Sequence, residues 1–422
     1  MVKKITLANG LRVVLAPAPG PAATALILVG TGSEYEAARV SGISHFLEHM
    51  VFKGTHKRPR AGQISEELDA LGAAYNAFTS QECTGYWAKA ASKKLPQLLT
   101  LLADLYLDPT FDAKEIEKER GVIIEEINMY EDMPMRKVHN EFTELLYGDQ
   151  PAGRPVAGKK DVVLRLKRKD FVHYRGATYS PKNTVVVVAG NFSAARVTKL
   201  AKSLFSRVPA KKAPKKTAPK EAQRVPAVRL AYKKSDQSHL VLGVRTFSMF
   251  DPRRYTLELL AHLMGGGMSS RLFQRIREEL GAAYYVRAES DLGHDHGFFA
   301  ISAGVNNPKL SEVVTAILAE CTRLIKEPVP ANELRRVKDH LLGTFLLGLE
   351  TSDEIAGFYG DQELAKRKTL TPSEVSARIE TVKAKDIQKL AGEIFRNDAL
   401  NLAVIGPLRD NRPLKTLLRF PK

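Results

Sequence analysis

Apolar residues recur along the chain in short runs of about the length of a β-strand. Two alternating runs, Ile5–Leu7 and Leu11–Leu15, flank the dipeptide Asn9-Gly10, an arrangement typical of a β-hairpin. Continuous runs such as Thr24–Val29 and Val185–Val188 are predicted to be buried strands. Because these runs are far shorter than the roughly 20 apolar residues that cross a bilayer, we expect neither a transmembrane segment nor a signal peptide. A membrane is therefore not an expected partner.

The order of these patterns is repeated in the two halves of the chain. In the first half, a helical pattern beginning at Lys169 precedes the strand pattern Asn183–Gly190, and in the second half a similar pattern beginning at Lys385 precedes Asn401–Gly406. An internal duplication explains this parallel. Strands and amphipathic helices alternate without strict β-α-β order, so the predicted fold class is α+β. We expect two tandem homologous domains, each a mostly antiparallel sheet with helices packed on one face.

A basic, proline-rich stretch separates the two halves. Residues 207–229 contain four prolines, and eight basic residues against one acidic residue. They show no apolar periodicity, and proline favours an extended backbone, so we interpret them as a solvated linker. The predicted domains are therefore residues 1–206 and residues 230–422.

The composition is that of an ordinary globular protein. The 422 residues exceed the usual size of one domain, and 44% hydrophobic with 26% charged residues excludes collagen-like and largely disordered chains. The net charge of +17 would suit a nucleic acid, but much of it lies in the linker, where aromatic residues that could stack on bases are missing. Nucleic acid is therefore not an expected partner. Cys83 and Cys321 are the only cysteines, so we expect no disulfide framework and a cytoplasmic location.

A metal-binding pattern occurs in the segment Ser41–Met50. His45 and His49 are four residues apart, so on a helix both imidazoles lie on one face and can share one metal ion. Glu48 projects beside them and can act on a metal-activated water without being a ligand. The pattern is H-x-x-E-H, an inverted form of the zincin motif. The alternative is a surface helix with two unrelated histidines.

A third ligand would have to come from another segment, and the acidic helix pattern Glu115–Ile127 is the best source. Glu119 and Glu126 are seven residues apart, two helical turns, and therefore share a face. One can ligate while the other orients a histidine ring. The spacing alone does not choose Glu126 over Glu125, and a solvated acidic face is the alternative interpretation.

These segments resemble the zinc metallopeptidases of the pitrilysin/insulinase family, which includes mitochondrial processing peptidases. The resemblance rests on His45–Thr55 and Glu119–Ile127, and extends to Leu7–Val13, Asn76–Thr79, Met129–Pro134 and Gly265–Phe273. It implies that His45, His49 and Glu126 bind Zn²⁺, that Glu48 is the general base and that Glu119 is a supporting carboxylate. It also implies two tandem domains in a chain of this length.

The second half lacks an H-x-x-E-H motif, so we expect no second site of that kind there. The corresponding helix carries His262 instead, His340 shows no ligand spacing, and Gly265–Gly267 is interpreted as a flexible loop. By resemblance, Arg277 and Tyr284 reach toward a substrate at the zinc. A guanidinium and a phenol are suitable hydrogen-bond donors to an oxyanion. The alternative is an ordinary surface arginine and a half-buried tyrosine.

The function expected from these features is zinc-dependent endopeptidase activity on unfolded or short peptides. The resemblance implies that a peptide substrate is bound as an added strand along Asn76, Ala77 and Phe78. Two other interpretations are a non-catalytic structural or partner subunit of the same family, and a basic nucleic-acid-binding protein. Because the family builds chambers from four homologous domains, we expect a homodimer or a heterodimer with a paralogue.

Overall fold

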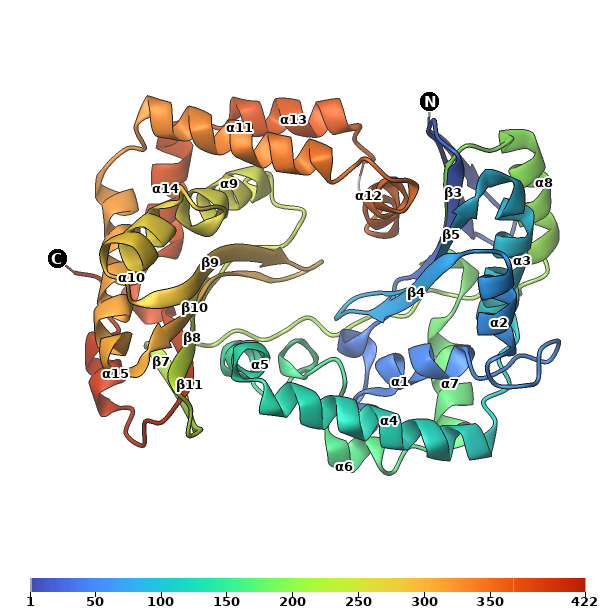
Figure 1. Cartoon of the computed structure of the whole chain (residues 1–422), viewed down its shortest axis with the longest axis horizontal. Coiled ribbons are helices and arrows are strands. Elements are labelled where there is room, and N and C mark those ends of the chain that lie inside the picture. Colours follow the sequence, from blue (N-terminus) through green and yellow to red (C-terminus); the bar gives the residue numbers. More distant parts are fainter. Residues whose placement is uncertain (1, 367, 422) are drawn as a thin grey trace. The chain divides into compact units, whose positions relative to one another are not determined.

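The computed structural model describes residues 2–366 and 368–421, which form two compact units (Figure 1). Unit 1 consists of Met1–Asn128, Arg154–Thr217 and Leu347–Thr369. Unit 2 consists of Met129–Gly153, Ala218–Leu346 and Leu370–Lys422. Each unit therefore includes a short segment from the other half of the chain, whereas the predicted domains follow chain order.

Unit 1 is built on a six-stranded sheet in the order β1-β2-β6-β3-β5-β4. Its strands are β1 (Lys3–Thr6), β2 (Arg12–Pro17), β3 (Ala22–Val29), β4 (Ala74–Thr79), β5 (Thr84–Ala91) and β6 (Thr184–Gly190). Strands β1 and β2 form the predicted hairpin, with Lys4 opposite Val14 and with Gly10 in the turn at a φ of 92°. Neighbouring strands are antiparallel except for β2 and β6, and β4 is an edge strand.

Helices cover both faces of this sheet. Those of unit 1 are α1 (Ile43–Val51), α2 (Gln63–Ala70), α3 (Leu95–Leu107), α4 (Ala113–Asp132, which ends in unit 2), α6 (Lys160–Val163), α7 (Arg168–Thr178), α8 (Ala194–Phe205) and α12 (Ser352–Leu364). The larger apolar core lies between the sheet and helices that include α1, α3, α7 and α8. The opposite face carries alternate strand residues such as Leu28 and Val187, which pack against Ala356 and Tyr359 of α12.

Unit 2 is built on a five-stranded sheet in the order β7-β11-β8-β10-β9. Its strands are β7 (Ala227–Tyr232), β8 (Gln237–Arg245), β9 (Ala283–Leu292), β10 (Gly297–Asn306) and β11 (Asn401–Gly406). Its helices are α5 (Pro134–Tyr147), α9 (Arg254–Gly265), the π-helical turn η6 (Phe273–Glu279), α10 (Leu310–Lys326), α11 (Ala331–Leu347, whose last residue is in unit 1), α13 (Pro372–Thr381), α14 (Ala384–Ile394) and α15 (Arg412–Leu417). One face packs on the main helical core, and the other is covered by Val138 and Phe142 of α5.

The two sheets repeat one topology, as expected from an internal duplication. The order β2-β6-β3-β5-β4 in unit 1 matches β7-β11-β8-β10-β9 in unit 2. In each sheet the first pair of this series is parallel and the remaining pairs are antiparallel. Helix α1 contacts the edge strand β4, and helix α9 contacts the edge strand β9 (Figure 1). The predicted class, α+β with two homologous and mostly antiparallel sheets, is confirmed, but helices cover both faces of each sheet and not one face as predicted.

The predicted linker is only partly a solvated segment. Residues 207–226 form neither helix nor strand, but Ala227 begins strand β7, so the linker ends earlier than expected. Within it, the side chain of Lys216 is only 7% exposed and forms ion pairs with Glu34 and Glu82 of unit 1. A buried ion pair fastens this part of the linker to unit 1, which a composition-based interpretation could not foresee.

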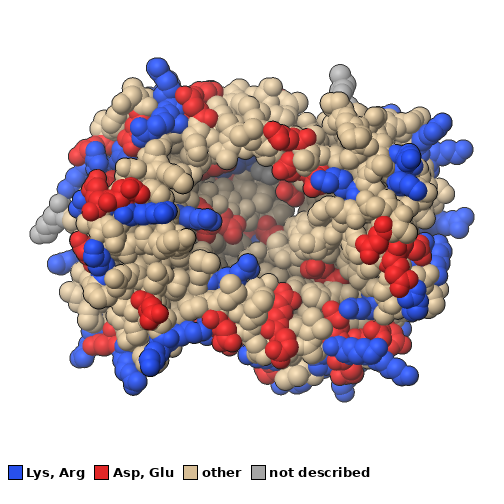
Figure 2. Space-filling view, viewed as in Figure 1, with Lys and Arg blue, Asp and Glu red and all other residues tan. Residues whose placement is uncertain are grey.

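None of the helices in the described part of the chain is long and apolar enough to cross a bilayer. On the face drawn in Figure 2, lysine and arginine side chains are interspersed with aspartate and glutamate side chains.

Candidate metal centre

The helix that carries the H-x-x-E-H pattern is held firmly at its N-terminus. The buried carboxylate of Glu36 accepts hydrogen bonds from the backbone N–H groups of Gly42 and Ser44, at 2.6 and 2.7 Å. These N–H groups belong to the first turn of α1, which has no preceding helical carbonyls to bond. Gly42 has a φ of 93°, and a Cβ there would lie 2.5 Å from the carbonyl oxygen of Ala157. The start of α1 is therefore fixed by a carboxylate and by a close backbone contact.

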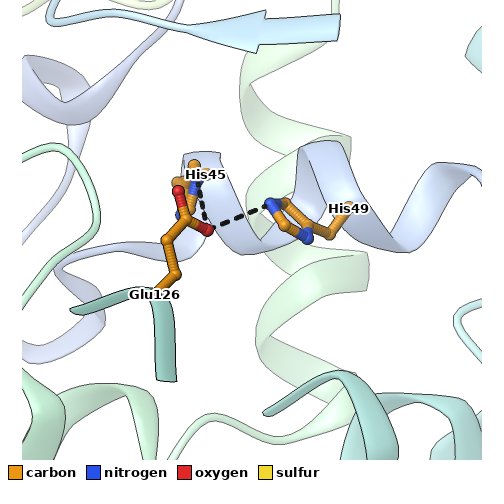
Figure 3. Close-up of side chains that lie close together, drawn as sticks. All are labelled: His45, His49 and Glu126. Carbon is orange, nitrogen blue, oxygen red and sulfur yellow. Dashed lines mark ion pairs between the residues drawn. The ribbon is translucent and has the colours of Figure 1, made fainter. Parts of the chain in front are cut away.

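Helix α1 buries Phe46, Leu47 and Met50 in the core and leaves His45 and His49 on another face. The acidic helix α4 passes this face and contributes Glu126 (Figure 3). Oε2 of Glu126 lies 3.6 Å from Nε2 of His45 and 3.7 Å from Nε2 of His49. The structure thus brings together the three residues that the resemblance named as zinc ligands.

This set of donors fits a zinc ion. One ligand atom from each of His45, His49 and Glu126 lies within 4.8 Å of the others. On a tetrahedral zinc with bonds of roughly 2.0–2.1 Å, ligand atoms are roughly 3.3–3.4 Å apart, so small side-chain movements suffice. The side chains are 12, 22 and 22% exposed, which shields the site and leaves it accessible. Two imidazoles and one carboxylate form the donor set of a catalytic zinc site with an open fourth position.

Glu119 orients one of the two histidine rings. Its Oε1 lies 2.9 Å from Nδ1 of His49, and its Oε2 lies 2.5 Å from Nζ of Lys53. Burial opposes ionisation of Glu119, but hydrogen bonds from His49 and Lys53 outweigh burial and lower its pKa. A charged Glu119 favours the tautomer of neutral His49 that carries its proton on Nδ1, which leaves Nε2 free to bind a metal.

The surroundings shift the pKa values of the two histidines in opposite directions. Burial, followed by the nearby His49, lowers the pKa of His45 to about 4. For His49, burial is outweighed by the hydrogen bond to Glu119 and by surrounding carboxylates, and its pKa is raised. Because a metal ligand must be the neutral imidazole, the lowered pKa of His45 favours metal binding, whereas the raised pKa of His49 makes protons compete with the metal for this ring.

Glu48 has its own hydrogen-bond partner on the edge strand. The hydroxyl of Thr79, at the end of β4, donates to Oε2 of Glu48 at 2.6 Å. Burial raises the pKa of Glu48, with a further contribution from the charge of Glu126, while the Thr79 bond and His49 act in the opposite direction. A carboxylate with a raised pKa beside a metal site is suited to accept and return a proton.

Glu125, which spacing alone had left open as a ligand, has a different environment. Its side chain is exposed on α4, and its Oε1 accepts a hydrogen bond of 3.3 Å from Asn128. Helix α4 is therefore oriented so that the side chain of Glu126, and not that of Glu125, faces the two histidines.

The predicted peptide-binding residues lie on β4. Asn76, Ala77 and Phe78 pair with Trp87, Tyr86 and Gly85 of β5 on one side, and the other side of the strand is the sheet edge. The Phe78 ring packs over Gly85, where a Cβ would come within 2.4 Å of it.

Arg277 and Tyr284 are brought together within unit 2. Arg277 lies in the π-helical turn η6, where the backbone N–H of Leu280 reaches the carbonyl of Arg275. Its guanidinium carbon lies 4.9 Å from the ring centre of Phe273 and 5.7 Å from that of Tyr284. Tyr284 is 75% exposed at the start of β9. The two predicted donors are therefore neighbours on an exposed face, and π-helical turns often occur at functional positions.

Sequence reasoning missed three residues that support the metal centre. Glu36 lies close to the motif along the chain, and Lys53 lies within the segment that carries the resemblance, but neither was given a role from the sequence. Thr79 was included only in the resemblance of its strand, and its contact with Glu48 depends on how β4 lies against α1.

Fold and site together define a class of protein: two repeated α+β units, one of which carries two histidines and a glutamate converging beside an H-x-x-E-H helix. The model of the family described as insulinase (peptidase family M16) matches residues 12–160, and that of the peptidase M16 inactive domain matches residues 165–341. The chain therefore belongs to peptidase family M16.

Curated relatives of similar length support this assignment. The chain is 34% identical to the uncharacterized zinc protease YmxG of Bacillus subtilis, a match that covers 96% of this chain and 98% of the relative. It is 33% identical to an uncharacterized zinc protease of Streptomyces coelicolor, over 97% of this chain and 91% of the relative.

Solved structures share the fold. A protease from Helicobacter pylori superposes with a TM-score of 0.92 at 25% identity, covering 96% of this chain and 99% of that chain. A chain of Complex III from Candida albicans superposes with a TM-score of 0.86 at 16% identity, covering 99% of this chain and all of that chain, and shows the common fold alone.

Proposed function

We propose that the protein is a zinc-dependent endopeptidase that hydrolyses peptide bonds of unfolded or short peptides. The observation that carries this proposal is the approach of His45, His49 and Glu126 within 4.8 Å of one another, next to a partly buried Glu48. The names of the relatives, which are zinc proteases, support the same assignment.

His45, His49 and Glu126 would hold the zinc ion. When bound, zinc supplies Lewis acidity, which polarises a peptide carbonyl and acidifies water. Glu48 accepts the proton of the attacking water and returns it to the leaving amine. Thr79 keeps the Glu48 carboxylate in one orientation during both steps, because its hydroxyl donates to Oε2.

The edge of β4 is the proposed binding site for the peptide substrate. Backbone groups on the open side of an edge strand pair readily with an extended chain, and such pairing is independent of the peptide's sequence. Since Thr79 contacts Glu48, a peptide paired along Asn76, Ala77 and Phe78 runs toward the proposed base. This arrangement suits unfolded or short peptides, which can adopt an extended backbone.

Arg277 and Tyr284 are proposed as donors to the oxyanion that develops on the peptide carbonyl. Their support is their chemistry, their mutual proximity and the resemblance of their segment to the family. Arg277→Lys and Tyr284→Phe should lower kcat more than they raise KM. Unchanged kcat in both variants would remove these residues from the mechanism.

The proposal is tested with the purified full-length protein. Zinc content and cleavage of a peptide library are measured before and after chelation, and again after zinc is restored. Glu48→Gln should keep zinc and lose cleavage by about 10²–10⁴-fold, because the substitution preserves shape and removes the base. Cleavage by Glu48→Gln near the wild-type rate would contradict the mechanism.

A non-catalytic structural or partner role is the second candidate. It is favoured by the match of residues 165–341 to the model of an inactive peptidase domain. The complete set His45, Glu48, His49 and Glu126 favours catalysis. A zinc-loaded protein that cleaves no member of the library would support the non-catalytic role.

We also propose that the chain works as a homodimer, with a heterodimer containing a paralogue as the competing arrangement. Two copies would supply four homologous sheets, and C2 symmetry would give two equivalent sites. Light scattering of the active protein should give twice the chain mass of 46.7 kDa. Full activity from a monomer would refute the proposal.

A further inference from the structure

Two histidines far apart in the sequence meet in unit 2. His262 lies near the end of α9 and His340 lies on α11, 78 residues later. Nε2 of His262 and Nδ1 of His340 are 2.5 Å apart, and the ring centres are 4.8 Å apart at an angle of 37°. Two nitrogen atoms this close cannot both carry a proton, so one ring donates its N–H and the other accepts with its lone pair.

The glycines that follow His262 make room for this pair. A Cβ on Gly266 would lie 2.3 Å from Nδ1 of His262, and a Cβ on Gly267 would lie 3.0 Å from Cε1 of His340. A Cβ on Gly265 would lie 2.1 Å from the backbone nitrogen of Ala288 on β9. The run expected to be a flexible loop is therefore a segment of close packing, two of whose residues are needed beside the histidine rings.

The pair is in a state suited to metal binding. Burial, and then the charge of His340, lowers the pKa of His262. A lowered pKa favours the neutral imidazole, which is the form that coordinates a metal. His340 is exposed on α11, so the pair is accessible to an ion from solvent.

The helices that carry the pair are the counterparts of those that carry the first site. Helix α9 contacts the edge strand β9 as α1 contacts β4, and α11 follows α10 as α4 follows α3. In unit 1 this pair of helices gathers His45, His49 and Glu126. The duplicated topology thus places imidazoles at the junction of the same two helices in both units.

We propose that His262 and His340 form a second metal site, which holds a divalent transition metal ion with a preference for imidazole, such as Zn²⁺ or Cu²⁺. The ion replaces the shared proton between Nε2 of His262 and Nδ1 of His340, and water completes its coordination. The nitrogen atoms move apart from 2.5 Å to roughly 3.3 Å, the separation of two ligands on a tetrahedral ion. Imidazole suits both metals, and copper(II) binds such donors more tightly than zinc. A bound ion would tie α9 to α11.

The test uses Cu²⁺ as the probe and four forms of the full-length, metal-stripped protein. These are the wild type, H45Q/H49Q, H262Q/H340Q and the variant with all four substitutions. Binding is followed by calorimetry, and electron paramagnetic resonance counts the nitrogen ligands. The wild type should bind one equivalent more than either double variant, and the quadruple variant should show only the background of the remaining groups. The signal of H45Q/H49Q should report two imidazole nitrogens.

Single substitutions and an unfolding measurement complete the design. H340Q alone should weaken this equivalent about tenfold or more, and because His340 is exposed this variant should fold normally. Cu²⁺ should raise the unfolding temperature of H45Q/H49Q and leave that of the quadruple variant unchanged. H173Q, at an exposed position on α7, serves as the matched control and should bind as the wild type does. The proposal is overturned if H262Q/H340Q binds as many equivalents as the wild type, or if H45Q/H49Q binds no more than the quadruple variant.

Discussion

Nδ1 of His49 and Oε1 of Glu119 lie 2.9 Å apart, and the opposite nitrogen of the same ring points at Glu126. One carboxylate thus orients the ring while a second, two turns further along α4, approaches its free nitrogen. Because Lys53 holds the other oxygen of Glu119, this orientation is set by the protein itself. The ring is therefore oriented for metal binding before a metal arrives.

Glu119→Gln is expected to weaken zinc binding by about 10–100-fold without abolishing it. The amide still reaches His49, but it lacks the charge that holds the proton on Nδ1. Competition with a chromogenic chelator measures the dissociation constant. Glu125→Gln, one exposed carboxylate on the same helix, is the control and should bind zinc as the wild type does. An unchanged constant for Glu119→Gln would mean that the ring is oriented by other contacts.

Glu126→Gln is expected to remove most of the zinc, from about one ion per chain to a small fraction of it. An amide oxygen is a much poorer zinc ligand than a carboxylate, and the remaining two histidines leave the ion exposed to chelators. Elemental analysis after dialysis against a mild chelator provides the measurement. If Glu126→Gln kept its zinc and Glu125→Gln lost it, the assignment of the ligand on α4 would be reversed.

Thr79→Val is expected to lower kcat about tenfold or more while leaving zinc content and KM nearly unchanged. Valine matches threonine in shape but cannot donate to Glu48, and hydrogen bonds to charged groups contribute about 1.5–3 kcal/mol. Thr79→Ser keeps the donor and should restore most of kcat. Equal losses in the two variants would indicate a packing role in place of the hydrogen bond.

Glu36 is expected to make unit 1 less stable as the pH rises from about 5 to 8. Burial raises the pKa of Glu36 to about 7, although Gly42 and Ser44 donate hydrogen bonds to it and Arg154 is near. In the unfolded chain its pKa is near 4.5, so between these values the folded state binds more protons and its stability falls with rising pH. The loss amounts to at most about 3 kcal/mol.

The measurement is urea unfolding at pH 5 and pH 8, followed by the fluorescence of Trp87. This residue is the single tryptophan of the chain and packs within unit 1. Glu36→Gln cannot ionise, so the wild type should lose stability relative to this variant at the higher pH. The prediction would be contradicted if the free energy of unfolding differed between the wild type and Glu36→Gln by the same amount at both pH values.

Gly360→Val on α12 is expected to destabilise unit 1 by about 1–3 kcal/mol. A Cβ at this position would lie 2.6 Å from Leu28 and 3.1 Å from Val187, so the helix must move away from the sheet. Gly357→Ala, three residues earlier on α12, has open space for its Cβ and should stabilise the helix by about 0.5–1 kcal/mol. The fluorescence of Trp87 follows both variants, and a stable Gly360→Val protein would show that α12 packs more loosely than described.

The sequence predicted features whose signal is local. Three elements are each indicated by residues within the element itself: the Asn9-Gly10 turn, the strand of valines around Val187 and the H-x-x-E-H helix. The structure shows the predicted elements there. The duplication of the sheet could also be predicted, because the order of strand and helix patterns is repeated even where the two halves no longer share residue identities.

Features that depend on distant packing were not predictable. The packing of α5 on the sheet of unit 2 depends on tertiary contacts that no local pattern specifies. The contact of Thr79 with Glu48 depends on the position of an edge strand against a helix. For His262 and His340, 78 residues of intervening chain leave no spacing that a motif could capture.

The exchange of segments between the units has a consequence for the synthesis of the chain. Unit 1 includes Leu347–Thr369, and the face of its sheet around Leu28 and Val187 stays uncovered until α12 is available. On a ribosome, the first half therefore cannot complete its fold when its own sequence has emerged, and it must wait with an exposed apolar sheet face while most of the second half is made. Such a face is prone to aggregation, so a nascent chain of this protein depends on fast elongation or on a chaperone that binds apolar surfaces.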